Sequence, residues 1–355
     1  MKRVRVDVPA RREAPKLVDV ARAARVSTAT VSRALSFPHK VHPDTLGRIQ
    51  RTIRQVGYVP HGPARALALR RSHTIGAVVP SLANAIFANT THALQKSLDQ
   101  EGYTLLLGCH EYDLQVEARI ARKLIERGVD GLILFGSQHE RELWRLLDAT
   151  RLPYVLTWAL DPDGERPCVG FDSRDAGWRV AQYLLDLGHR RIGVVSLPLD
   201  SNERHRERVA GVRDALAARG LSLPAERVIE RRLTPIAGRE AMRELLRART
   251  RPTAVICCND NLAIGAIAEC HAQRLRVPAD VSVCGFDDVE FAAMMTPALT
   301  TVFFPAAELG RFAAEHLLGR LAGREPPRQQ QLPVELIVRG STAAPPRAAA
   351  RSAAE

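Results

Sequence analysis

The sequence has little of what marks a secreted, membrane-bound or metal-stabilised chain. Only six of its 355 residues are cysteines, and none forms a Cys-x-x-Cys pair. No apolar run approaches the length of a membrane span, and no apolar segment follows the basic N-terminus, so neither a membrane helix nor a signal peptide is expected. We expect reduced cysteines in the core of a cytoplasmic protein, and no zinc site. The cysteines are Cys109, Cys168, Cys257, Cys258, Cys270 and Cys284.

Signatures of enzymes are also missing. The sequence contains no Walker-type phosphate loop, no nucleophile elbow and no Gly-x-Gly-x-x-Gly segment after a strand-like run. His189, in Leu-Gly-His-Arg-Arg, is expected to be a turn residue between a helix and a strand rather than a catalytic base. These observations predict a protein that is not an enzyme and that needs no metal or cofactor.

What the chain has in excess is positive charge, and this charge lies at one end. The formal net charge is +12. Residues 1–71 hold 16 Lys/Arg and 4 Asp/Glu, whereas the remainder holds 35 residues of each sign. The N-terminal part therefore carries the whole excess, which is typical of a segment that binds a polyanion such as DNA.

The same N-terminal part has the pattern of a helix-turn-helix. We expect a first helix over 17–24, a turn in which Ser27 is a natural N-cap, and a second helix over 28–35. A third helix is expected over 44–56, where apolar residues recur at helical spacing and Gly57 ends the pattern. In such a motif the second helix enters the DNA major groove.

The residues that open the second helix are the candidates for DNA contact. Arg33 can bond guanine with two hydrogen bonds, and the methyl groups of Thr28 and Ala29 can pack on thymine methyls. Short hydroxyl side chains suit phosphate oxygens. For Ser27 the alternative is a capping role alone, and for Thr30 it is an ordinary helix position. The hydroxyl candidates are Ser27, Thr30 and Ser32.

From Thr74 onward, apolar strand-like runs alternate with amphipathic helical stretches. This alternation predicts parallel sheets with helices on both faces. Nine such runs exceed one small sheet, so we expect two α/β lobes with a ligand in the cleft between them. The expected strands are 75–79, 104–108, 131–135, 154–157, 168–170, 192–196, 228–230, 254–258 and 281–286.

Several segments resemble the lactose-repressor (LacI) family of bacterial transcription regulators. The N-terminal signature is Ser-Thr-Ala-Thr-Val-Ser-Arg-Ala-Leu at 27–35, followed by Gly-Tyr-Val-Pro and Ala-Arg-Ala-Leu. Later family-like runs occur at 74–80, 128–134, 187–193, 258–265, 285–288 and 296–302. Within the family the chain looks most similar to the gluconate-repressor-like subgroup, through Val-Gly-Phe-Asp at 169–172 and Ala-Ile-Ala-Glu-Cys at 266–270.

The resemblance implies an all-α helix-turn-helix headpiece followed by a two-lobed domain like the periplasmic binding proteins, with two doubly wound parallel sheets. The headpiece would span 16–58, a hinge helix or linker 59–72, and the ligand-binding domain 73–340. The N-terminal lobe would comprise about 73–172 and 303–331, and the C-terminal lobe about 173–302 and 332–340. We expect a disordered basic tail at 1–15 and a disordered tail at 341–355.

The hinge segment supplies a second set of DNA contacts by resemblance. Leu67 matches the family leucine that wedges between base pairs in the minor groove, and Arg65 lies on the same short helix. The family often has Asn where this chain has His61, which is the third candidate contact. The alternative for Leu67 is packing against the lobes.

The cleft residues also follow from the resemblance. Arg208, in Arg-Val-Ala-Gly, matches the family arginine that holds the ligand, and Phe87 lies at the family's aromatic position after the first strand. Asn259 and Asp287 fall at the ends of expected strands, where cleft residues belong. The alternatives are a surface arginine for Arg208, core packing for Phe87 and a turn residue for Asp287. Further pocket candidates are Trp158, Arg204 and Leu233.

Together these inferences predict a cytoplasmic, homodimeric repressor that binds pseudo-palindromic double-stranded operator DNA. A small effector, a sugar or sugar acid, would change the angle between the lobes and release the DNA; co-repression or dual regulation is the alternative sign. A transport protein that binds sugars would share the two lobes, but it needs a signal peptide and no helix-turn-helix.

Overall fold

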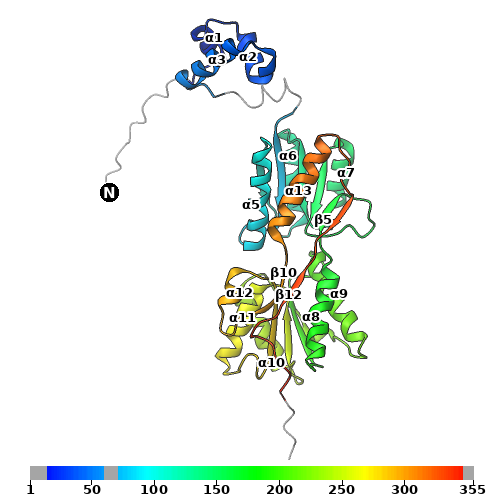
Figure 1. Ribbon diagram of the computed structural model, residues 1–355. Helices are drawn as coiled ribbons and strands as arrows, with labels where there is room; N and C mark the ends of the chain where they lie inside the picture. The colour runs from blue at the N-terminus through cyan, green and yellow to red at the C-terminus, as the bar shows by residue number, and fades with distance from the viewer. Residues whose placement is uncertain (1–13, 60–70, 347–355) are drawn as a thin grey trace, which may run out of the picture. The chain divides into compact units, whose positions relative to one another are not determined.

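The computed structural model describes residues 14–59 and 71–346, and it divides the chain into two compact units, Met1–His73 and Thr74–Glu355. Within the described residues, no helix is both long enough and apolar enough to cross a bilayer. All six cysteines are free, and five of them are buried. The two units are described separately below, and Figure 1 shows their elements.

The first unit is a set of three α-helices with a small core. These are α1 (Leu17–Ala23), α2 (Thr28–Ser36) and α3 (Pro43–Val56), and a short 3-10 helix η1 (Pro38–Lys40) separates the last two. Gly57 ends α3 in the left-handed conformation that glycine adopts without strain, at φ 70°. The predicted three-helix pattern is thus confirmed. The core residues are Val20, Ala21, Ala24, Val31, Ala34 and Ile49.

The first lobe of the second unit contains a six-stranded sheet in the order β11-β5-β4-β3-β1-β2, and every pairing in it is parallel. The long central helices α5 and α13 pack against each other (Figure 1). Its strands are β1 (Thr74–Val79), β2 (Thr104–Cys109), β3 (Gly131–Phe135), β4 (Tyr154–Thr157), β5 (Cys168–Gly170) and β11 (Gln329–Gln331). Its helices are α5 (Ala85–Gln100), α6 (Leu114–Glu126), α7 (Arg141–Thr150) and α13 (Ala306–Leu321).

The second lobe repeats this plan in the order β12-β10-β9-β8-β6-β7. A parallel sheet was expected, and this sheet is parallel except that its last strand, β12, runs antiparallel to β10. Its strands are β6 (Ile192–Ser196), β7 (Val228–Glu230), β8 (Ala254–Cys257), β9 (Ser282–Asp287), β10 (Thr300–Phe303) and β12 (Glu335–Ile337). Its helices are α8 (Ser173–Asp186), α9 (Glu203–Ala217), η2 (Ala225–Arg227), α10 (Pro235–Arg247), α11 (Asp260–Ala272) and α12 (Glu290–Met294).

Glycines let α8 and α9 approach each other closely. A Cβ atom added at Gly177 of α8 would lie 2.0 Å from the carbonyl oxygen of Arg208, and one added at Gly211 of α9 would lie 1.9 Å from that of Arg174. Real Cβ atoms are never that close to a backbone oxygen. The two helix backbones are therefore in direct contact beside Arg208.

The start of the C-terminal tail is ordered, which corrects the expectation of disorder from residue 341. Ser341 is fully buried, and its Oγ donates to the carbonyl oxygen of Val283 over 2.6 Å. The carbonyl oxygen of Ala343 accepts from Ser282 Oγ over 3.1 Å and lies 2.8 Å from Nε2 of His189. The tail residues 341–343 thus bind the end of the second sheet. The tail is rich in Ala, Pro and Arg, and this composition predicted disorder and gave no indication of these hydrogen bonds.

Candidate functional sites

The helix α2 has one exposed face, and it carries most of the residues predicted to contact DNA. Thr28, Ala29, Ser32 and Arg33 are all exposed, whereas Val31 between them is fully buried in the small core. The periodicity of the helix therefore separates a packing face from a polar face. Side chains on such a free face can reach base edges and phosphates.

Ser27 and Thr30 are tied into the start of this helix. Ser27 Oγ accepts a hydrogen bond from the Thr30 amide over 3.1 Å and lies 2.8 Å from Thr30 Oγ1. Ser27 is therefore the N-cap of α2. The exposed Ser27 hydroxyl also has a hydrogen of its own, which can donate to a phosphate oxygen while Oγ accepts from the Thr30 amide. The other predicted DNA contacts, His61, Arg65 and Leu67, lie outside the described residues.

The four predicted effector residues line one small cavity between the two lobes. Phe87 comes from α5 of the first lobe, while Arg208, Asn259 and Asp287 come from the second. The cavity holds about 20 Å³, which is room for little more than one water molecule. Both lobes thus contribute side chains to the same cavity. The other lining residues are Asn84, Ile86, Tyr112, Trp158, Asn202, Arg204, His205 and Leu233.

Arg208 is the most deeply held charge in this cavity. It is 3% exposed, and its Nη1 donates to the carbonyl oxygen of Cys258 over 2.7 Å. Its guanidinium lies 4.8 Å from the ring centres of both Phe286 and Phe304, which supply cation–π attraction. Burial lowers the pKa of Arg208, and Asp287 opposes that shift. Because Arg208 Nε has no hydrogen-bond partner among the described residues, its N–H is available to a ligand.

Asp287 faces Arg208 at the end of β9. Burial raises the pKa of this carboxyl to about 6, although Arg208 and Asn84 act in the opposite direction. Asn259 Nδ2 donates a short hydrogen bond to Asp287 Oδ2. The backbone of Asp287 has φ 109°, a region that side-chain-bearing residues rarely adopt. Strain of this kind is concentrated at functional sites, where the surrounding fold holds it in place.

Aromatic residues form the first-lobe side of the cavity. Phe87 lies edge-on to Trp158 with ring centres 5.0 Å apart, and Trp158 Nε1 donates to Thr90 Oγ1 over 3.2 Å. The guanidinium of Arg204, from the second lobe, lies 5.6 Å from the centre of the Phe87 ring. Phe87 therefore packs in the core, as its alternative interpretation required, and also faces the cavity.

Sequence reasoning missed several cavity residues. Asn84 and Asn202 are N-caps of α5 and α9, just as Asn259 is of α11, so each lies where a helix begins after a strand. That cap position was a usable signal. Nothing in the sequence pointed to His205, whose Nδ1 accepts from the Leu197 amide over 3.2 Å. Burial holds the pKa of His205 well below its usual value, so the ring is neutral.

Comparison with known proteins assigns both parts of the chain. Residues 16–61 match the model of bacterial regulatory proteins of the lacI family, and residues 181–342 match a periplasmic binding protein-like domain. The HTH-type transcriptional repressor CytR of Escherichia coli K12 is 34% identical over 334 residues, which cover 94% of this chain and 98% of CytR.

Solved structures agree with this assignment. The lac repressor dimer bound to operator and the anti-inducer ONPF is 27% identical with a TM-score of 0.82, over 94% of this chain and all of that one. Transcription regulator GntR of Chromobacterium violaceum is 36% identical with a TM-score of 0.72, over 76% of this chain and 99% of GntR. The helix-turn-helix match removes the transport-protein alternative, and the matched relatives are regulators rather than enzymes.

Proposed function

The chain belongs to the LacI family of bacterial regulatory proteins. On that premise we propose that it is a repressor whose binding to operator DNA is controlled by a small effector in the interlobe cavity. The observation that carries the effector half of the proposal is the convergence of Arg208, Asp287 and Asn259 in that cavity. Burying three polar side chains lowers the stability of the fold unless they form hydrogen bonds to one another or to a ligand.

The DNA half of the proposal assigns base reading to α2. Arg33 would bond a guanine, Thr28 and Ala29 would pack on thymine methyls, and Ser27, Thr30 and Ser32 would hold phosphates. His61, Arg65 and Leu67 would act in the minor groove at the centre of the site. The lac repressor relative is a dimer on its operator, which supports a homodimer on a pseudo-palindromic operator here.

The effector is proposed to be a sugar or a sugar acid, which the cavity of about 20 Å³ admits only when the two lobes move apart. A guanidinium, a carboxylate and an amide satisfy the hydroxyls of a polyol, and an arginine also pairs with a carboxylate. Arg208 Nε has no partner among the described residues, and the positive charge of Arg204 lies over Phe87 on the opposite wall. The flat side of Phe87 suits the apolar face of a sugar ring.

Control follows from the position of the cavity. A ligand that contacts both lobes changes the free-energy difference between their arrangements, typically by about 1–3 kcal/mol. We propose induction, in which the effector releases DNA; co-repression is the alternative outcome of the same experiment. We propose a cytoplasmic location, because a regulator of this kind acts on chromosomal DNA.

The test has two parts. A gel shift with DNA from upstream of the protein's own gene should show a sequence-specific complex at modest salt, and its absence would refute operator binding. Calorimetry against sugars, sugar acids and nucleobases should then identify the effector. Arg208→Ala should bind operator normally but lose the response to that compound.

A further inference from the structure

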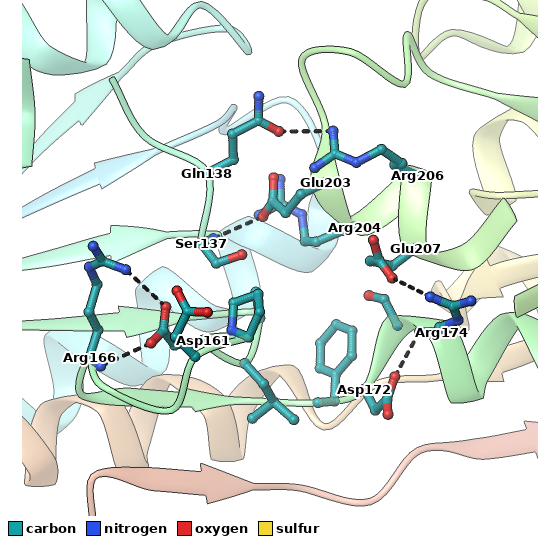
Figure 2. A pocket seen from close by; sticks show the side chains of 16 residues that line it. Ser137, Gln138, Asp161, Arg166, Asp172, Arg174, Glu203, Arg204, Arg206 and Glu207 are labelled. Carbon is teal, nitrogen blue, oxygen red and sulfur yellow. Dashed lines mark hydrogen bonds and ion pairs between the residues drawn. The ribbon is translucent and has the colours of Figure 1, made fainter. Parts of the chain in front are cut away.

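A short loop of the first lobe, residues 136–138, follows β3 and forms hydrogen bonds to the second lobe. The Ser137 amide donates to Glu203 Oε1 over 3.0 Å, and Arg206 Nη1 donates to Gln138 Oε1 over 3.0 Å. Figure 2 shows the two loop residues facing these partners, which lie at the start of α9. We call residues 136–138 the interlobe loop.

Gly136 brings the backbone of the interlobe loop directly against the second lobe. Its φ is 101°, which favours glycine, and a Cβ atom added to it would lie 2.4 Å from Glu203 Oε1, closer than real Cβ atoms come to any atom. Gln138 Nε2 also donates to the carbonyl oxygen of Asp200 over 2.9 Å. The position of the interlobe loop therefore determines whether these bonds between the lobes can form.

His139 holds the interlobe loop from inside the first lobe. Its Nδ1 lies 2.8 Å from Glu117 Oε2 on α6, and its Nε2 lies 3.2 Å from the carbonyl oxygen of Gly136. The side chains of His139 and Glu117 are completely buried. Glu117 Oε1 has no hydrogen-bond partner among the described residues, so this carboxyl group depends on His139. The pair thus joins α6 to the loop that contacts the second lobe.

The two hydrogen bonds of His139 require one proton more than a neutral imidazole beside a carboxylate provides. A carbonyl oxygen only accepts hydrogen bonds, and an ionised carboxylate also only accepts. Either His139 is an imidazolium that donates from both nitrogens, or a protonated Glu117 donates to Nδ1 while the Nε2–H group donates to Gly136. In both cases the pair has no net charge, and two protons complete its two hydrogen bonds.

Loss of one of these protons leaves a single N–H group between two acceptors. The carboxylate is the stronger acceptor, because hydrogen bonds to ionised groups are roughly twice as strong as those between neutral groups. The remaining proton therefore stays on Nδ1 of His139, and the lone pair of Nε2 then faces the carbonyl oxygen of Gly136 across 3.2 Å. Because two facing acceptors repel each other, the interlobe loop loses its attachment to the first lobe.

His110, after β2, is another buried histidine near Glu117, and its ring is neutral. Burial is the largest cause that lowers the pKa of His110, Arg204 and His139 act in the same direction, and Glu117 opposes them. The ring that shares a proton with Glu117 is therefore that of His139. Further charged groups around the pair and the interlobe loop are Glu203 and Arg204 on α9, and Arg166, whose guanidinium lies 4.2 Å from the centre of the Trp144 ring beside His139.

We propose that the Glu117–His139 pair is a pH-sensitive switch for the arrangement of the two lobes. With two protons the pair holds the interlobe loop against α9, and with one proton it releases the loop. Because the arrangement with the interlobe hydrogen bonds binds the additional proton, falling pH favours this arrangement and rising pH opens the lobes. The switch lies within the two lobes, so it depends neither on the identity of the effector nor on DNA binding.

Hydrogen exchange of the Ser137 amide tests the switch directly, because the acceptor of this amide, Glu203, belongs to the other lobe. The full-length protein without ligand is exchanged from about pH 5 to about pH 9, and each rate is compared with that of an unstructured peptide at the same pH. Protection of the wild-type amide should fall about tenfold as the pH rises, since one hydrogen bond that holds the loop is lost. Protonation of Glu203 itself would weaken protection at low pH, which is the opposite sign.

Glu117→Gln should lock the switch without changing its shape. The amide of the glutamine donates to Nδ1 of His139 at every pH, so the Nε2–H group always donates to Gly136 and protection should stay high over the whole range. His139→Asn should show low protection at every pH, because it has no ring to titrate. His110→Gln is the matched control at the neighbouring histidine and should show the same fall as the wild type.

Constant protection of the wild-type Ser137 amide over this pH range would overturn the proposal. A fall of equal size in Glu117→Gln would overturn it as well, and so would the disappearance of the fall in His110→Gln. None of these outcomes bears on the effector or on the operator, since neither is present in the experiment.

Discussion

The two units of this protein place their key arginines in opposite surroundings. Arg33 is exposed on the free face of α2, while Arg208 is 3% exposed and lies beside two aromatic rings. DNA is a long polyanion that must be reached from outside, so its contacts are side chains in water. A small ligand must be taken out of water, so the side chains that contact it are buried. Burying these polar side chains lowers the stability of the fold. Substitutions should therefore separate the two functions.

The largest expected effect is on effector binding. Arg208→Ala removes a buried charged donor to the ligand, and truncating one partner of a buried, hydrogen-bonded charge pair typically costs about 2–5 kcal/mol of binding free energy, or about 30-fold or more in affinity. Calorimetry with the identified effector should show this loss while operator affinity stays within about twofold. Arg213→Ala, at an exposed arginine of the same helix, is the control and should bind the effector normally. Equal effects of the two substitutions would contradict the assignment.

The buried carboxyl of Asp287 predicts a pH effect on stability. Its pKa is about 6 in the fold, above the usual aspartate value of 3.8, so its contribution to stability is full below pH 3.8 and is lost as the pH rises through 6. Between pH 4 and 7 the wild type should therefore lose up to about 3 kcal/mol of unfolding free energy relative to Asp287→Asn. Urea unfolding of both proteins at the two pH values measures the difference. A constant difference would show that the carboxyl is ionised throughout.

On the DNA side, Arg33→Ala should cost about 1–3 kcal/mol of specific binding and relax the preference at one base pair. Because Arg33 is exposed, the thermal stability of the protein should hardly change. Selection of binding sites from a random library reads out the consensus directly. Arg54→Ala, exposed on α3, should keep the consensus. An unchanged consensus for Arg33→Ala would remove Arg33 from base reading.

The smallest effect is expected for Leu67→Ser. If Leu67 is a minor-groove wedge, its loss should weaken specific binding roughly tenfold and non-specific binding hardly at all, since only the specific complex includes a kinked central step. Salt-controlled titrations with operator and random DNA distinguish the two. Equal losses would favour a packing role for this leucine.

Much of the fold could be predicted because its signals are local. All nine expected strands are present within one residue of their predicted ends, since short apolar runs ended by polar caps define them. The antiparallel pairing of β12 with β10 could not be predicted, because it depends on residues far apart in the chain. The same is true of Ser341, whose hydrogen bond to Val283 joins the tail to a distant strand.

The functional site, too, could be predicted only in part. Asn259 and Asp287 were found because they end strands, and the structure brings both to the cavity. The partners that determine their chemistry were not found. The pKa of Asp287, at the end of β9, depends on its burial and on Arg208, which lies some eighty positions earlier on α9, and Arg208 itself contacts Phe304 from the strand-to-helix turn before α13. Long-range burial of this kind leaves no pattern in the sequence.

The proposed function requires that effector binding changes the affinity for operator DNA. Fluorescence anisotropy of wild-type protein on its selected operator, with each sugar, sugar acid and nucleoside in turn, measures it directly. At least one compound should change operator affinity by about 5- to 150-fold, and the same compound should leave the operator affinity of Arg208→Ala unchanged. An operator affinity that no compound alters, or an Arg208→Ala protein that responds like the wild type, would contradict a regulator controlled through this cavity.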